Sequence, residues 1–200
     1  MTYNFDEIID RRNTNSENVE GWRPYIFHCG PERVFPYKDE EFIRMWVADM
    51  EFAVAPEILQ AITDRVDRRI LGYTLVYDKG YYEALRAWCE SRYGWSFPKE
   101  QLTFSPGVIP ALYQLTEDLV KPLNGKVLTM TPAYGFFLHA CEYNGVELVT
   151  SPLREENGRF SVDWEDLEAK AADPDVKLLM LCNPHNPTGR IWTCLLYTSP

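Results

Sequence analysis

The segment Asn183-Pro-His-Asn-Pro-Thr-Gly189 holds two asparagines, each followed by a proline that restricts the backbone. Each asparagine side chain can lend an amide to a ligand oxygen. The segment follows a nearly continuous apolar run, residues 176–182, which is typical of a fully buried parallel strand. Ligands of open parallel sheets bind beyond the carboxyl ends of the strands. The position of this turn therefore favours a binding role, although its residues also suit an ordinary turn.

A second segment, Ser105-Pro-Gly-Val-Ile-Pro110, lies between a predicted strand and a predicted helix. Gly107 would let the backbone approach an anion closely, and the helix start offers N–H groups without acceptors and a positive dipole end. Phosphate is the natural ligand, and a plain strand-to-helix turn is the alternative. The sequence has no Gly-x-Gly-x-x-Gly fingerprint and no Gly-Lys-Ser/Thr loop, so it does not support a dinucleotide or a nucleoside triphosphate.

A third segment, Thr131-Pro-Ala-Tyr134, directly follows another predicted strand. A tyrosine on a loop above a sheet can stack on a flat heteroaromatic ring. Tyr134 alone is more typical of packing at a loop–helix junction. The three segments together indicate one binding region at the carboxyl edge of a sheet.

The elements expected to position these segments alternate between helix and strand. Ile58, Ile62, Val66 and Ile70 recur every four residues and predict a helix that begins at Pro56 and is ended by Gly72. A second helix is predicted over 80–93 with Gly94 as its stop. The remaining predictions are strand 101–104, helix 107–120, strand 126–130, helix 135–143 closed by Asn144-Gly145, strand 146–150, helix 163–172 with Asp163 as N-cap, and strand 176–182. This order predicts an α/β domain with a mainly parallel sheet.

Composition excludes several classes of function. The chain has 200 residues and a formal net charge of −10, which disfavours nucleic acid and anionic membrane surfaces as partners. No apolar stretch is long enough to span a membrane, and no secretory signal is visible. The five cysteines are widely spaced, which favours reduced thiols in the cytoplasm. The three histidines lack metal-ligand spacing, so no metal site is predicted.

The segment Asn183–Gly189 resembles the Asn-Pro-x-Asn-Pro-Thr-Gly motif of class I/II aminotransferases, which are fold-type I pyridoxal-phosphate (PLP) enzymes. The order of the three segments is similar to that of the cystathionine β-lyase branch named MalY/PatB. Upstream segments that look like the same branch are Asp10-Arg-Arg-Asn-Thr14, Trp46-Val-Ala-Asp-Met50 and Gly72-Tyr-Thr74. The resemblance covers about residues 5–193. One departure is Glu51, where the family commonly has aspartate.

The resemblance implies a role for each matching residue. The amides of Val108 and Ile109 would hold the phosphate of PLP, with Gly107 giving room. Tyr134 would stack on the pyridine ring, and Asn186 would bond its phenolic oxygen. Tyr73 would reach the phosphate in the neighbouring subunit, which implies a homodimer with shared sites. The segment 46–52 would line the substrate entrance.

The implied reaction is β-elimination from a sulfur amino acid such as cystathionine, which gives a thiol, pyruvate and ammonia. PLP acts as the electron sink after loss of the Cα proton. Two alternatives remain open at this point: an aminotransferase on the same fold, and a protein that binds a ligand or partner without catalysis. The upstream segments favour the lyase.

The family's lysine, carried in a Ser-x-Ser-Lys type segment, is absent from these residues, so no catalytic residue is assigned. All seven lysines are expected to be exposed charges. We expect an N-terminal fragment with three parts: an arm over 1–50, a partial PLP-binding large domain over 51–193, and a non-native tail over 194–200. Such a fragment is expected to be inactive alone and to aggregate through an unpaired sheet edge.

Overall fold

The computed structural model describes residues 3–75 and 78–193. They belong to two compact units, Met1–Thr74 and Leu75–Pro200. The division expected at residue 50 stays a prediction, and the tail expected over 194–200 lies outside the described residues.

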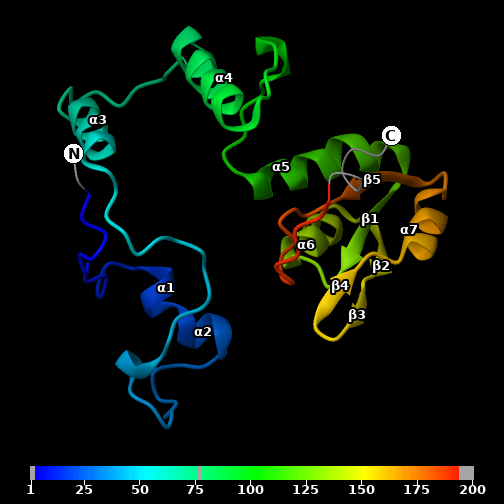
Figure 1. Ribbon diagram of the computed structural model, residues 1–200, viewed down its shortest axis with the longest axis horizontal. Helices are drawn as coiled ribbons and strands as arrows, with labels where there is room; N and C mark the ends of the chain where they lie inside the picture. The colour runs from blue at the N-terminus through cyan, green and yellow to red at the C-terminus, as the bar shows by residue number, and fades with distance from the viewer. Residues whose placement is uncertain (1–2, 76–77, 194–200) are drawn as a thin grey trace. The chain divides into compact units, whose positions relative to one another are not determined.

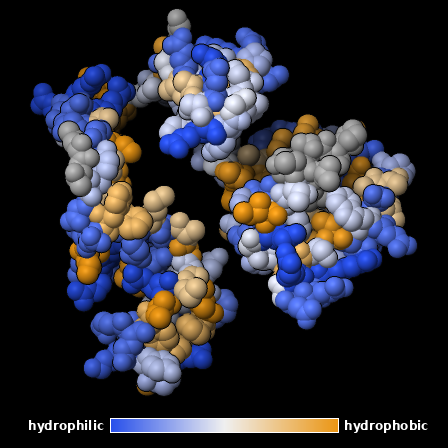
Figure 2. Space-filling model, in the orientation of Figure 1, coloured by the Kyte–Doolittle hydropathy of each residue, from blue (hydrophilic) through white to orange (hydrophobic). Residues whose placement is uncertain are grey.

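The unit Met1–Thr74 is largely irregular and is held together by aromatic packing. Its helical segments are α1 (Glu17–Glu20), α2 (Trp22–Ile26), the 3-10 turn η1 (Asp39–Glu41) and α3 (Pro56–Val66). The Trp22 ring lies 5.4 Å from that of Phe35 and 5.0 Å from that of Phe42. Figure 2 shows apolar residues on the surface of this unit as well. The predicted extended arm therefore contains three short helical segments.

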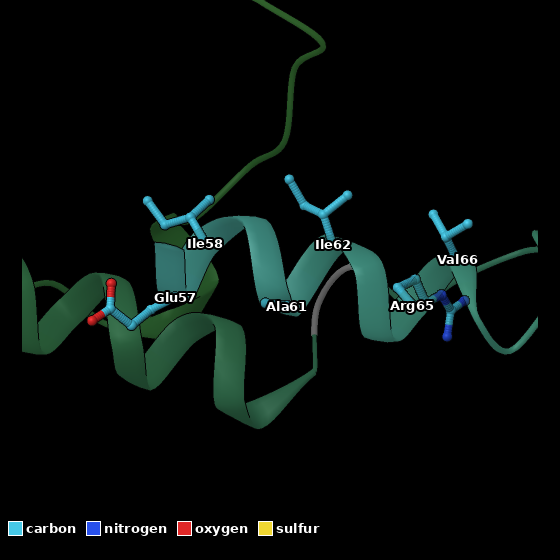
Figure 3. Close-up of a pocket in the computed structure, with 6 residues that line it drawn as sticks. All are labelled: Glu57, Ile58, Ala61, Ile62, Arg65 and Val66. Atoms are coloured by element: carbon cyan, nitrogen blue, oxygen red, sulfur yellow. The ribbon is translucent and has the colours of Figure 1, made fainter. Parts of the chain in front are cut away.

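Helix α3 begins at Pro56 as predicted but ends sooner than predicted. Arg69 has a φ of +57°, and this left-handed conformation is incompatible with a helix that continues to Ile70 and Gly72. The prediction that Gly72 ends the helix was therefore wrong. Ile58, Ile62 and Val66 do lie on one side of α3, where they border an open pocket (Figure 3), and each is more than half exposed.

The unit Leu75–Pro200 begins with α4 (Lys79–Tyr93), which confirms the predicted second helix. The Asp78 carboxylate accepts a hydrogen bond from the Tyr81 N–H at 2.7 Å, and Gly94 ends the helix with a φ of +61°. The strand predicted over 101–104 was wrong. The 3-10 turn η2 (Lys99–Gln101) ends there, and the next residues pair with no strand in the described chain.

A parallel sheet of three strands forms the centre of this unit, in the order β2 (Glu147–Pro152), β1 (Lys126–Thr131), β5 (Val176–Met180). Thr129 of β1 pairs with Thr150 of β2 and with Met180 of β5. The predicted α/β class with a parallel sheet is confirmed. The predicted full burial of the last strand was wrong, because β5 has a neighbouring strand on one side only among the described residues and Leu179 is 46% exposed.

Helices cover both faces of this sheet (Figure 1). One face carries α5 (Val108–Leu115), the π-helical turn η3 (Thr116–Val120) and α6 (Gly135–Asn144). The 3-10 turn η4 (Lys121–Leu123) connects η3 to β1. The other face carries α7 (Trp164–Ala171), whose N-cap Asp163 accepts a hydrogen bond from the Asp166 N–H as predicted. The side chains of Val127 and Leu128 point to opposite faces, and both are fully buried.

A two-stranded hairpin that was not predicted from the sequence consists of β3 (Arg154–Glu156) and β4 (Arg159–Ser161). Its turn is Asn157-Gly158, and both residues have positive φ, +52° and +76°. An Asn-Gly turn between two short strands is the usual hairpin signal, so the residues did carry the information.

Candidate functional site

The three predicted segments all lie at the carboxyl edge of the sheet in the unit Leu75–Pro200. Strands β1 and β5 run parallel, and the Thr129 hydroxyl donates a hydrogen bond to the Met180 carbonyl oxygen at 3.0 Å. The loops that follow these two strands therefore leave the sheet at the same edge. The helical segment from α5 through η3 runs antiparallel to β1. It is about 20 Å long, close to the length of β1. The N-terminus of α5 therefore lies at the carboxyl edge of the sheet.

The N-terminus of α5 offers two backbone donors. Val108 and Ile109 are its first two residues, and their N–H groups have no acceptor within the helix. Pro110 has no N–H, and the Ala111 N–H already donates to the Gly107 carbonyl oxygen at 3.2 Å. The first turn thus leaves two adjacent donors at the positive end of the helix dipole, which suits one anionic group.

Gly107 directly precedes these donors. Its φ of 170° is extended backbone that any residue adopts, so conformation does not require glycine here. A Cβ at this position would meet only the Pro110 ring within 4 Å, at 3.4 Å. The Ser105 hydroxyl donates to the Gly107 carbonyl oxygen at 2.8 Å and fixes the approach to the helix. A Cβ at residue 107 would thus meet no backbone atom within 4 Å, and the role of Gly107 in giving a phosphate room stays a prediction.

Tyr134 occupies the N-cap position of α6, directly after the loop that follows β1. Its half-buried ring packs against the core cluster that contains Phe137 and Met180. The ring centroid lies 5.3 Å from that of Phe136 and 6.2 Å from that of Phe137. Packing and ligand contact are thus compatible, because the core supports the ring while part of it stays accessible.

The turn after β5 is braced by its own residues. The Asn183 side-chain oxygen accepts a hydrogen bond from the Trp192 N–H at 3.1 Å, and the Trp192 indole N–H donates to the Cys182 carbonyl oxygen at 2.9 Å. His185 Nδ1 lies 2.7 Å from the Thr188 hydroxyl, and its ring meets Trp192 edge to face at 5.3 Å. The Asn183 side-chain oxygen therefore braces the turn, while the ligand contact predicted for its amide N–H stays a prediction.

Asn186 differs from Asn183. Its N–H donates to the Cys182 sulfur at 3.3 Å, while the exposed carboxamide has no hydrogen-bond partner among the described residues. The turn thus holds the backbone of Asn186 and leaves its side chain available. His185 and Trp192, which brace the turn, were missed by the sequence analysis.

Burial of His185 makes the stability of the turn depend on pH. The side chain is 3% exposed, and desolvation lowers the pKa of His185 below its ordinary value. The stabilisation is therefore fully present above about pH 6.5 and is lost as the pH falls toward the lower folded-state pKa. We expect the melting temperature to fall more between pH 7.5 and pH 5.5 in the wild type than in His185→Gln, as measured by circular dichroism. Equal pH slopes in the two proteins would contradict this.

Tyr73 is the remaining residue that the sequence assigned to the cofactor. Tyr73 belongs to the unit Met1–Thr74, and its side chain is fully exposed. Two lysines were wrongly expected to be free surface charges: Lys126 and Lys170 are partly buried, with ion pairs to Asp173 at 3.0 Å and to Asp166 at 2.7 Å. Neither lies beside Val108 or Asn186 in any contact of the described residues.

Within residues 3–75 and 78–193, no helix is both long and apolar enough to cross a membrane. The same ranges contain no group of three or more histidine, cysteine, aspartate or glutamate side chains that could hold a metal ion. Cys29, Cys89, Cys141 and Cys182 are free thiols, and burial raises the pKa of Cys141 to about 11.

Comparison with known proteins identifies the family. A family model described as aminotransferase class I and II matches residues 40–197, so the chain belongs to that family. It is 42% identical over 149 residues to cystathionine beta-lyase PatB of Bacillus subtilis, which covers 74% of this chain and 38% of that protein. It is 27% identical over 192 residues to protein MalY of Escherichia coli, covering 96% of this chain and 46% of MalY.

A solved structure supports the same placement. The PLP-bound C-S lyase from Staphylococcus hominis is 43% identical and superimposes with a TM-score of 0.81, over 96% of this chain and 46% of that one. The chain thus spans less than half the length of these relatives. The predicted family, with its α/β fold, is confirmed.

Proposed function

We propose that the whole protein is a PLP-dependent carbon–sulfur β-lyase that acts on cystathionine or a similar sulfur amino acid. The observation that supports this most directly is that the N–H groups of Val108 and Ile109 have no acceptor among the described residues. They lie at the sheet edge where Asn186 leaves its carboxamide available. The relatives named cystathionine beta-lyase and C-S lyase support the choice of reaction.

The residues of this chain fit PLP, group by group. The N–H groups of Val108 and Ile109 would donate to the phosphate, and Gly107 would give that group room. Tyr134 would pack its ring against the pyridine ring, and the Asn186 carboxamide would donate to the phenolic oxygen. These contacts bind and orient the cofactor without forming a covalent bond to it.

The chemistry supplied by bound PLP is that of an electron sink for the carbanion at Cα. With PLP bound, the net reaction would convert a thioether amino acid and water into a thiol, pyruvate and ammonia. The lysine that moves the Cα proton is assigned to a part of the whole protein outside these 200 residues.

We also propose a cytoplasmic homodimer with shared sites, in which Tyr73 donates to the phosphate bound by the neighbouring subunit. The full exposure of Tyr73 and the widely spaced free cysteines are consistent with this proposal. Mixing Tyr73→Phe and Asn186→Ala subunits would test it, because each variant alone is expected to bind PLP more weakly than the wild type at both of its sites. Hybrid dimers carry one intact site each, so random exchange returns about a quarter of all sites to the wild-type PLP affinity if the sites are shared.

The activity is tested on the product of the complete gene. Purified protein is given cystathionine, and release of pyruvate and homocysteine is followed with and without added keto acid. We expect product release that does not depend on the keto acid. Amino transfer to the keto acid without elimination would identify an aminotransferase instead, and neither reaction would point to binding without catalysis.

The role of Asn186 is tested with Asn186→Ala, and Asn183→Ala is the matched control. The first removes a side chain assigned to the cofactor, and the second removes a brace of the turn. We expect Asn186→Ala to bind PLP about tenfold more weakly with an unchanged melting temperature of the apo-protein. We expect Asn183→Ala to lower that melting temperature, so the two roles separate in a PLP titration combined with a thermal scan.

A further inference from the structure

The backbone of Asn186 is held less firmly than the rest of the turn after β5. Among the residues that the structure describes, its only hydrogen bond joins its N–H to the Cys182 sulfur, at 3.3 Å. The neighbouring His185 is held at both its N–H and its carbonyl oxygen, by Arg190 and Gly189, each at 2.7 Å. The place of Asn186 in the turn therefore depends on the side chain of Cys182.

The thiol of Cys182 makes a second contact within the turn. It donates to the Pro184 carbonyl oxygen at 3.2 Å, while its sulfur accepts the hydrogen bond from the Asn186 N–H. A thiol is both a weak donor and a weak acceptor, so one side chain serves both contacts. The two hydrogen bonds together fix the path of the chain between Pro184 and Asn186.

Cys182 is itself anchored in the core of its unit. Its half-buried side chain packs against the cluster that contains Met180, against which Tyr134 also packs. The Cys182 carbonyl oxygen accepts the hydrogen bond from the Trp192 indole N–H at 2.9 Å, which holds its backbone as well. Cys182 therefore connects Asn186 to the same packed layer that supports the Tyr134 ring.

We propose that Cys182 is a positioning residue that fixes the Asn186 carboxamide relative to the Tyr134 ring. This inference rests on the proposed PLP site, because these two side chains are assigned to the phenolic oxygen and to the face of one pyridine ring. A hydrogen bond weakens steeply when its donor is misaligned, so the carboxamide must be placed accurately. Without the thiol, the carboxamide is aligned in only a fraction of molecules, and the apparent PLP affinity falls by that fraction.

The test compares Cys182→Ala with Cys141→Ala in the product of the complete gene. Cys141 lies in α6, is buried in the same cluster, and makes no hydrogen bond to the turn in the described part of the chain. We expect Cys182→Ala to bind PLP about three- to tenfold more weakly than the wild type. We expect Cys141→Ala to lower the melting temperature through lost packing and to keep the wild-type PLP affinity.

The absorbance of bound PLP gives a readout that lost packing alone does not move. A hydrogen bond donated to the phenolic oxygen stabilises its negative charge and weakens its hold on a proton. The pH midpoint of the absorbance change should therefore rise in Cys182→Ala, in the same direction as in Asn186→Ala and by no more. Cys182→Ser keeps a donor and an acceptor, so its midpoint should lie closer to that of the wild type. Cys141→Ala should leave the midpoint unchanged.

A double substitution shows whether Cys182 acts through Asn186. If it does, the variant that combines Asn186→Ala with Cys182→Ala binds PLP no more weakly than Asn186→Ala alone. Two independent roles would instead add their losses of binding free energy. In the apo-protein, the Asn186 N–H is expected to exchange with deuterium faster in Cys182→Ala than in the wild type, because its acceptor is gone.

The outcomes separate this inference from the proposed function. Wild-type PLP affinity and pH midpoint in Cys182→Ala, or additive losses in the double variant, would overturn the inference and leave the proposed function standing. A whole protein that binds no PLP would overturn the proposed function and, with it, this inference. Cys182→Val serves if Cys182→Ala folds poorly, because valine fills the site without a hydrogen-bonding group.

Discussion

Val108→Pro is expected to weaken PLP binding about 10- to 100-fold, because it removes one hydrogen bond to a charged phosphate. Proline suits the first position of a helix, so α5 itself is expected to stay intact. Gly107 before it already has the extended backbone that a following proline requires. The substitution therefore removes one N–H and little else.

The matched control is Val108→Ala, which keeps the N–H. Because Val108 is 76% exposed, shortening its side chain costs little packing. Fluorescence titration of the apo-protein with PLP measures both affinities. If Val108→Pro bound PLP as tightly as Val108→Ala, the backbone of α5 would have no part in holding the phosphate.

Leu128→Ala is expected to lower the free energy of unfolding by about 2–5 kcal/mol, the range for emptying a buried leucine site. Leu128 lies in the middle of β1 with no exposed surface and packs in the cluster that contains Met130 and Leu167. Strands flank β1 on both sides, so its backbone cannot shift easily to fill the cavity.

Leu123→Ala serves as the comparison, because Leu123 is exposed on η4 next to the same strand. Its loss is expected to change the free energy of unfolding by less than about 0.5 kcal/mol. Urea denaturation of the apo-protein, followed by circular dichroism, measures both. Similar midpoints for the two variants would mean that Leu128 is not in the core.

The periodic patterns predicted the elements of the sheet well, because strands β1 and β5 and helices α6 and α7 each carry a local signal. Asn144-Gly145 and Gly94 end their helices as predicted, since both glycines adopt a positive φ. The α3 prediction ran too far because Ile70 continues the four-residue spacing after the helix has ended. Periodicity describes a face of a helix and does not determine where the helix ends.

The errors came from properties that depend on partners distant in sequence. Residues 101–104 have strand-forming side chains but no neighbouring strand in the described chain. Burial of Leu179 was inferred from an apolar run, whereas it depends on whether a strand lies beside β5. In the same way, nothing local distinguishes Asn183 from Asn186, and the difference arises because Trp192 binds the first of them.

The bracing of the turn after β5 also bears on how fast and by what route a ligand binds. Asn183 binds Trp192, and His185 contacts both Thr188 and Trp192, so the turn is held by contacts within the chain itself. A site that is ordered in advance loses little conformational freedom on association. Association at Asn186 should therefore follow a single exponential whose rate rises linearly with ligand concentration. No slow isomerisation of this turn should follow the encounter, and a cofactor removed by dialysis should return at the same rate as in the first loading.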